Sequence, residues 1–110
     1  MFQTATNPSV YYSSLAQDED LSELVLLFVG EMPDRVAALV AAAENQNWEV
    51  LGQLAHQLKG AGGSYGFEQL TPFAKALEFA AKNQIGEGEI LASLDQLLAA
   101  CQRIRPGISP

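Results

Sequence analysis

His56 is the only histidine in the chain, and it lies in a segment rich in glycine. If this segment is helical, a rotation of about 100° per residue places four further residues in the same sector: Gly52, Lys59, Gly60 and Gly63. A neutral imidazole nitrogen is a nucleophile near pH 7. Lys59, one turn later, would place a positive charge beside phosphoryl oxygens. These residue types at this spacing predict phosphoryl transfer through His56.

Three of these neighbours are glycines, which form helices poorly. Each glycine inside a helix costs about 0.5 to 1 kcal/mol relative to alanine, so three on an exposed face cost roughly 2 to 3 kcal/mol. The opposite side of the helix is apolar and can face a core: Leu51, Leu54, Leu58, Ala61 and Tyr65. We therefore expect Gly52, Gly60 and Gly63 to keep a flat surface on which another protein's active site can approach the histidine.

The segment resembles the signature of histidine-containing phosphotransfer (Hpt) domains, the relay modules of two-component signalling. The resemblance is carried by a set of matching positions: His56, Leu58, Lys59, Gly60, Ser64, Gly66 and Phe67. It implies that His56 accepts a phosphoryl group, that receiver-domain aspartates donate and accept it, and that a hybrid sensor histidine kinase is a further partner. It also implies that Mg²⁺ is held by the partner receiver domain, so we expect no cofactor in this chain.

Motifs for the use of ATP are missing from the sequence. It has no glycine-rich nucleotide loop after a strand, no phosphate-loop lysine and no acidic cluster that would hold Mg²⁺ beside His56. We therefore expect a phosphohistidine carrier without autokinase activity. The alternative, from a different functional class, is a non-catalytic helical module that docks on receiver or kinase domains. Loss of His56 or Lys59 would mark that alternative, and both residues are present.

Glu78 is the expected partner of His56 on the following helix. Residues equidistant from a turn lie at the same height on antiparallel helices, and His56 precedes Gly66 by ten residues, or about 15 Å of helix axis. Its counterparts lie near residues 76–78, where Glu78 is the only polar side chain. A carboxylate that accepts a hydrogen bond from Nδ1 would fix the tautomer and leave Nε2 facing outward.

Two lysines on the same predicted helix leave an alternative open. Glu78 could instead be solvated and paired with Lys75 or Lys82 at helical spacing. Lys75 either adds positive charge at the rim of the site or is an ordinary surface lysine. Gln57, next to His56, is a candidate for polar contact with a partner.

A partner surface is expected on the helix that precedes this site. The run from Leu24 to Val29 is apolar around its whole circumference, which is more than one core-facing stripe requires. The excess is either covered by the N-terminal arm or forms a patch for a partner. We expect the docking surface to combine apolar residues of this helix with the glycine face and the end of the next helix: Leu24, Val25, Phe28, Met32, Gly60, Gly63 and Ser64.

The composition narrows the class of protein. At 110 residues and 48% hydrophobic content the chain can build one domain with a core. A net charge of −7 with six scattered basic residues argues against nucleic acid as a partner. The single cysteine, Cys101, excludes a disulfide framework and is expected in the core. The N-terminus lacks signal-peptide features and no apolar run could span a membrane, so we expect a monomeric cytoplasmic protein.

Hydrophobic periodicity predicts an all-α fold. We expect helices over about residues 20–45, 48–65, 68–82 and 89–104. The first begins at a capping box formed by residues 20–23 and is kinked or broken near Pro33. Thr71-Pro72 is an alternative start for the third. No strand is expected.

Short connections between these helices predict their arrangement. They favour an antiparallel up-down four-helix bundle over residues 18–106. The polar, turn-rich residues 1–17 are expected to form an irregular arm docked by its aromatic side chains, and residues 107–110 a C-terminal tail.

Overall fold

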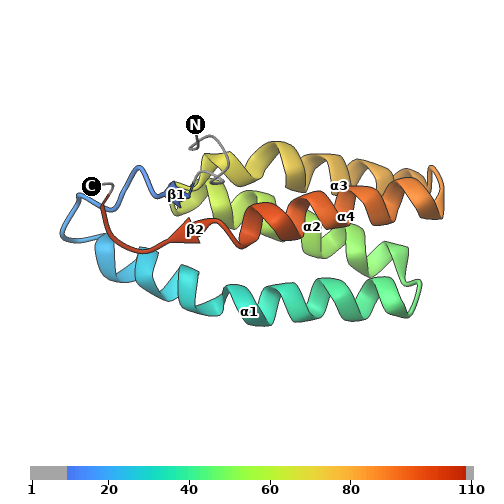
Figure 1. Cartoon of the computed structure of the whole chain (residues 1–110), viewed down its shortest axis with the longest axis horizontal. Coiled ribbons are helices and arrows are strands. Elements are labelled where there is room, and N and C mark those ends of the chain that lie inside the picture. The colour runs from blue at the N-terminus through green and yellow to red at the C-terminus, as the bar shows by residue number, and fades with distance from the viewer. Residues whose placement is uncertain (1–9, 109–110) are drawn as a thin grey trace, which may run out of the picture.

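The computed structural model describes residues 10–108. The elements in chain order are β1 (Tyr11–Tyr12), α1 (Ser22–Glu44), α2 (Trp48–Ser64), the 3₁₀ turn η2 (Glu68–Leu70), α3 (Thr71–Asn83), α4 (Glu87–Cys101) and β2 (Ile104–Arg105). The four long helices lie side by side, with their connections at alternate ends of the molecule (Figure 1). The fold is therefore mostly helical, as expected, and it also contains a pair of short strands that was not predicted.

Helix α1 begins differently from the prediction. Leu21 is the N-cap residue and makes no side-chain cap hydrogen bond, so the expected capping box does not form. Instead, the carbonyl oxygen of Asp18 accepts hydrogen bonds from the backbone N–H groups of Leu21 and Ser22 at 3.0 and 2.9 Å. The Asp18 carboxylate also accepts one from Asp20 N–H at 2.9 Å. A turn built on Asp18 thus satisfies the entry to the helix.

Helix α1 then runs without a break through Pro33. A proline inside a helix removes one hydrogen bond and costs about 3 kcal/mol. Buried side chains lie on both sides of this position, Val25 and Phe28 before it and Leu39 after it. Because both halves bury an apolar face against the same core, packing outweighs the loss at Pro33.

A left-handed glycine ends helix α2 as predicted. Gly66 has a φ of 83°, Phe67 N–H donates to the Gly62 carbonyl at 2.7 Å, and Gly66 N–H donates to that of Gly63 at 3.2 Å. These bonds satisfy the last carbonyls of the helix, and the buried Phe67 side chain makes the apolar contact typical of this cap. Helix α3 then begins at Thr71 with Pro72 in its first turn, which was the alternative start; a single 3₁₀ turn precedes it.

The last helix is shorter at its C-terminus than expected. Helix α4 ends at Cys101, and Ile104 instead pairs in parallel with Tyr11. Tyr11 N–H donates to the Arg103 carbonyl at 2.8 Å, and the Arg103 guanidinium lies 5.8 Å from the centre of the Tyr11 ring. This part of the predicted arm is therefore attached to the segment that follows α4, whereas residues 1–9 lie outside the described residues. Period-2 alternation cannot reveal strands of two residues.

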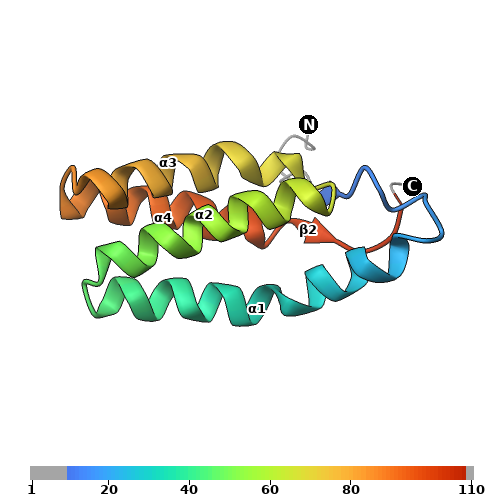
Figure 2. The same ribbon diagram turned by 180° about the vertical axis from the view of Figure 1, so that it is seen from behind.

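The core lies between the four helices, and α2 runs between α1 and α3 (Figure 2). Phe28 is its aromatic centre, because its ring stacks on Tyr65 and on Phe67 at centroid distances of 5.2 and 5.6 Å. Cys101 is buried, as expected, and burial raises the pKa of its thiol to about 11. Within the described residues, no helix combines the length and the apolar character needed to cross a membrane.

Candidate functional site

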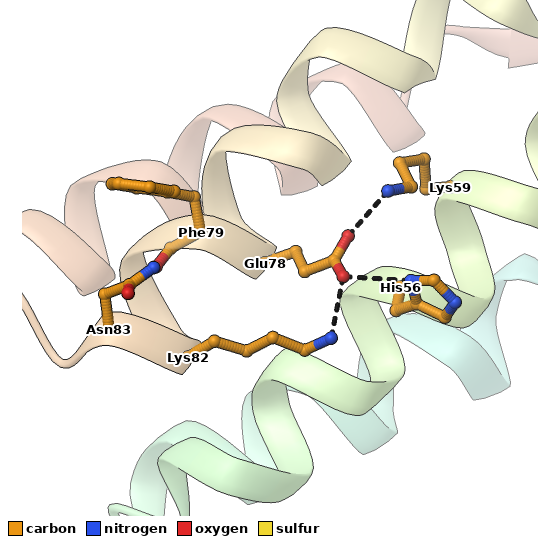
Figure 3. Close-up of polar contacts among 6 residues, drawn as sticks. All are labelled: His56, Lys59, Glu78, Phe79, Lys82 and Asn83. Carbon is orange, nitrogen blue, oxygen red and sulfur yellow. Dashed lines mark hydrogen bonds and ion pairs between the residues drawn. The ribbon is translucent and has the colours of Figure 1, made fainter.

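His56 projects from the middle of α2 with 60% of its side chain exposed. Its Nδ1 atom lies 2.9 Å from Oε2 of Glu78 on α3. Figure 3 shows Nδ1 facing the carboxylate and the other ring nitrogen, Nε2, pointing away from it. The contact expected from height matching across the Gly66 turn is therefore confirmed, and the free nitrogen is accessible.

Two lysines hold the Glu78 carboxylate. Lys82 Nζ donates a hydrogen bond to Oε2 at 2.8 Å, and Lys59 Nζ forms an ion pair with Oε1 at 2.8 Å. The Glu78 side chain is only 14% exposed, although its partners are more open to solvent. Glu78 thus contacts His56 and pairs with Lys82 of its own helix at the same time. The alternative of a solvated Glu78 without the histidine contact is wrong, because the side chain is largely shielded between the two helices.

The lysines also set the charge of Glu78. The contacts with Lys59 and Lys82, together with the smaller contribution of His56, lower its pKa to about 2 against the opposing effect of desolvation. At neutral pH the carboxylate is therefore ionised and can only accept hydrogen bonds. Nδ1 of His56 must supply the proton of the shared bond. In a neutral ring the lone pair then resides on Nε2.

A shallow concavity of about 250 Å³ lies next to this cluster. It is lined by Lys59, Lys75, Glu78, Phe79, Lys82 and Asn83. These include all three lysines of a chain whose net charge is −7. The structure therefore places Lys75 at the rim of a locally basic surface beside the histidine.

The glycine face is smaller than predicted. A Cβ atom added at Gly60 or Gly63 would meet nothing within 4 Å in the described part of the chain, so these two positions are open. Gly52, in contrast, is buried, and a Cβ atom there would lie 3.0 Å from Cγ of Lys82. The expectation that Gly52 belongs to a bare surface is wrong, because the stem of Lys82 packs across it.

Three of the apolar residues proposed for docking are inside the protein. Val25 and Phe28 are 1% exposed and Met32 is 4% exposed, so the expectation that they contact a partner is wrong. The aromatic stacking around Phe28 explains this burial. Leu24 is exposed, as a docking residue must be, and so is Leu27.

The other residues expected at the partner surface are accessible. Gln57 and Ser64 are both exposed on α2. Gln57 also lines a groove of about 210 Å³ between α1 and α2, together with Arg35 and Leu54. The site therefore continues from His56 towards α1 as well as towards α3.

Comparison with known protein families identifies the family to which a chain with this site belongs. The family model described as the Hpt domain matches residues 23–105. The chain belongs to the Hpt domain family. No curated protein and no solved structure matches the chain. The family match supports a phosphotransfer module of a phosphorelay, and it spans both helices that carry the His56 cluster.

The contribution of Lys82 to the site of this Hpt domain was only partly predictable from the sequence. Its spacing of four residues from Glu78 was visible and predicted a pair on one helix. That the same carboxylate oxygen also faces His56 could not be predicted, because it depends on how closely α2 and α3 approach at Gly52. Among the described residues of the Hpt domain, no three His, Cys, Asp or Glu side chains are grouped to hold a metal ion.

Proposed function

We propose that this Hpt domain carries a phosphoryl group on Nε2 of His56 and relays it between receiver-domain aspartates. The observation that supports this proposal is the 2.9 Å contact between Nδ1 of His56 and Glu78. The His56 side chain makes this contact while it is 60% exposed. The contact orients the ring so that the unprotonated nitrogen faces a partner. An exposed imidazole without such a contact would sample both tautomers and several orientations.

The chemistry needs no proton to leave the domain. The Nε2 lone pair attacks the phosphorus of an aspartyl phosphate, the N–P bond forms, and the bond to the aspartate oxygen breaks. The ring becomes positively charged with its proton still on Nδ1, where the Glu78 carboxylate stabilises it. In the return step an aspartate oxygen attacks the phosphorus and the electron pair of the N–P bond returns to Nε2.

Lys59 and Lys75 supply positive charge near the transferred group in this proposal. Lys59 lies one turn after His56, 30% exposed and paired with Glu78, so its charge is fixed close to the ring. Lys75 is exposed at the rim of the neighbouring concavity. Both ammonium groups would act as point charges that stabilise the negative charge on the phosphoryl oxygens. Mg²⁺ belongs to the receiver's acidic pocket, and the Hpt domain itself needs no cofactor.

The receiver is proposed to dock over the open face of α2 and the neighbouring edge of α1. Gly60 and Gly63 allow close approach. The proposed surface also includes exposed residues of α1 and α2: Leu24, Leu27, Gln57 and Ser64. A flat strip with an apolar border suits a helix laid against it.

We also propose an arrangement of the helices and a cellular setting for the domain. Residues 18–106 form an antiparallel up-down bundle. The predicted arm (residues 1–17) and the predicted tail (residues 107–110) both extend outside the residues that the structure describes. The domain works as a cytoplasmic monomer, with receiver domains and a hybrid sensor kinase as its partners.

The test is to mix the domain with a small phosphorylated receiver and to separate the products on a gel that retards phosphoproteins. We expect the domain to be retarded and the phosphoryl group to be lost in acid, as a phosphoramidate is. If the receiver binds but the domain is never phosphorylated, the proposal fails and the non-catalytic docking module takes its place.

A further inference from the structure

Lys82 reaches the His56 site by crossing helix α2. It belongs to α3, and its Cγ atom would be only 3.0 Å from a Cβ atom built on Gly52 of α2. Real Cβ atoms almost never come closer than this distance, so any larger residue at position 52 would press on the lysine stem. Gly52 is buried although a glycine inside a helix is unfavourable by about 0.5 to 1 kcal/mol. The space that it leaves is filled by Lys82.

The far end of Lys82 meets the oxygen that contacts the histidine. Its Nζ atom lies 2.8 Å from Oε2 of Glu78, and the same oxygen lies 2.9 Å from Nδ1 of His56. The other oxygen, Oε1, faces Lys59 on the opposite side of the carboxylate. Figure 3 shows this carboxylate between the two ammonium groups, with the imidazole beside Oε2.

A glutamate carboxylate turns easily, because its terminal torsion has a broad, roughly two-fold preference. One lysine alone would allow either oxygen to face it and the carboxylate plane to rotate. Two lysines, one at each oxygen, fix that plane and so fix the acceptor that Nδ1 needs.

We infer that Lys82 is a positioning residue for phosphoryl transfer, which orients Glu78 and through it His56, and that Gly52 is small so that Lys82 can reach this carboxylate. The kinetic part of this inference rests on the proposed function. The structural part does not, because it concerns the orientation of Glu78 and the tautomer of His56 in the free domain.

The experiment compares the 110-residue chain with four variants: Lys82→Met, Lys82→Arg, Gly52→Ala and the double variant Gly52→Ala/Lys82→Met. Methionine keeps most of the apolar stem without the charge, and arginine restores the charge. Gly60→Ala is the matched control, because it makes the same substitution on the same helix where a Cβ atom meets nothing within 4 Å in the described chain. Three quantities are measured: the fraction of His56 protonated at Nδ1 from ¹⁵N chemical shifts, the titration of the Glu78 carboxyl by ¹³C NMR, and the rate of phosphoryl transfer from a phosphorylated receiver.

We expect Lys82→Met to lower the Nδ1-protonated fraction, to raise the pKa of Glu78 above about 2, and to slow transfer about twofold to fivefold, the range of a partly exposed ion pair. Lys82→Arg should restore all three quantities. Gly52→Ala should shift them in the same direction as Lys82→Met, whereas Gly60→Ala should leave the two NMR quantities unchanged. In the double variant, the alanine should add nothing to the effect of the methionine.

Unchanged ¹⁵N shifts and carboxyl titration in Lys82→Met would overturn the inference. Equal NMR effects of Gly52→Ala and Gly60→Ala, or additive effects in the double variant, would overturn the part assigned to Gly52. Normal transfer by Lys82→Met despite altered NMR quantities would overturn the positioning role. If wild-type protein accepts no phosphoryl group, the proposed function fails, and the NMR measurements still decide whether Lys82 and Gly52 orient the cluster.

Discussion

Nδ1 of His56 and Oε2 of Glu78 are 2.9 Å apart, although the two residues belong to different helices. The carboxylate is ionised at neutral pH because Lys59 and Lys82 lower its pKa to about 2. It therefore accepts a hydrogen bond from Nδ1, and in a neutral ring the lone pair then resides on Nε2. One inter-helix contact thus fixes both the orientation and the tautomer of a side chain that is otherwise open to solvent.

Replacement of His56 by glutamine should abolish phosphoryl acceptance without unfolding the domain. The side chain is 60% exposed, and an exposed polar substitution usually changes the free energy of unfolding by less than about 0.5 kcal/mol. Labelling by a phosphorylated receiver and thermal unfolding followed by circular dichroism measure the two effects. A labelled His56→Gln variant would place the acceptor at another residue.

The contacts of Glu78 should make stability depend on pH in acid. The pKa of Glu78 is lowered from 4.5 to about 2 in the folded protein, so its stabilising contribution is fully present above about pH 4.5 and is lost as the pH falls through 2. Because the lysine partners are partly exposed, we expect about 1 kcal/mol from this source. Thermal unfolding of wild type and Glu78→Gln from pH 7 to pH 2 measures it. The two stability curves should converge at the acid end, and a constant gap between them would contradict the assignment.

The same Glu78→Gln variant should slow transfer without abolishing it. The nucleophilic nitrogen remains, while the charge that stabilises the phosphorylated ring is lost, which we expect to reduce the rate about tenfold. Single-turnover transfer from a phosphorylated receiver is the measurement. An unchanged rate would remove Glu78 from the reaction.

Gly63→Gln should separate docking from stability. Gly63 is exposed, and in the described chain a Cβ atom built there would meet nothing within 4 Å. Glutamine is the better helix former by roughly half a kcal/mol or more, so thermal stability should stay equal or rise while transfer is lost. Gly88→Gln is the control, because Gly88 is an open helical glycine on α4, outside the His56 cluster. Normal transfer by the Gly63 variant would show that the receiver docks elsewhere.

Two exposed leucines of α1 offer a matched test of the docking edge. Leu27 and Leu26 are 60% and 57% exposed. Leu27 lies on the same face of α1 as Arg35, which lines the groove between α1 and α2. Leu26 lies nearer the face of Val29, which lines the groove between α1 and α4. Leu27→Gln should therefore weaken receiver binding in calorimetry about tenfold, and Leu26→Gln should not. Equal effects of the two substitutions would contradict this placement.

The parts of the site that follow from helix geometry could be predicted from the sequence. A glycine stop at Gly66 fixes where α2 ends, and a constant rise per residue then brings Glu78 to the height of His56. The exposure of Gly60 and Gly63 follows from their sector on the same helix. These inferences need only the period and the position of one turn.

The parts that depend on packing distance could not be predicted. Gly52 lies in the same sector as His56, yet it is buried because α3 approaches closely there and Lys82 crosses it. The burial of Val25 and Phe28 could not be predicted, because an all-apolar run does not show which of its faces is inside. The pairing of Tyr11 with Ile104 joins distant parts of the chain through strands of two residues, which leave no periodic pattern.

In the proposed reaction the phosphoryl group resides on Nε2 of His56 while Nδ1 keeps its proton. NMR of ¹⁵N-histidine-labelled protein, phosphorylated by a receiver and observed through ¹⁵N–³¹P coupling, tests it most directly. We expect one phosphorylated histidine, with phosphorus coupled to Nε2 and a proton on Nδ1 at neutral pH. Phosphorus coupled to Nδ1, or a phosphoryl group on a residue other than His56, would contradict it.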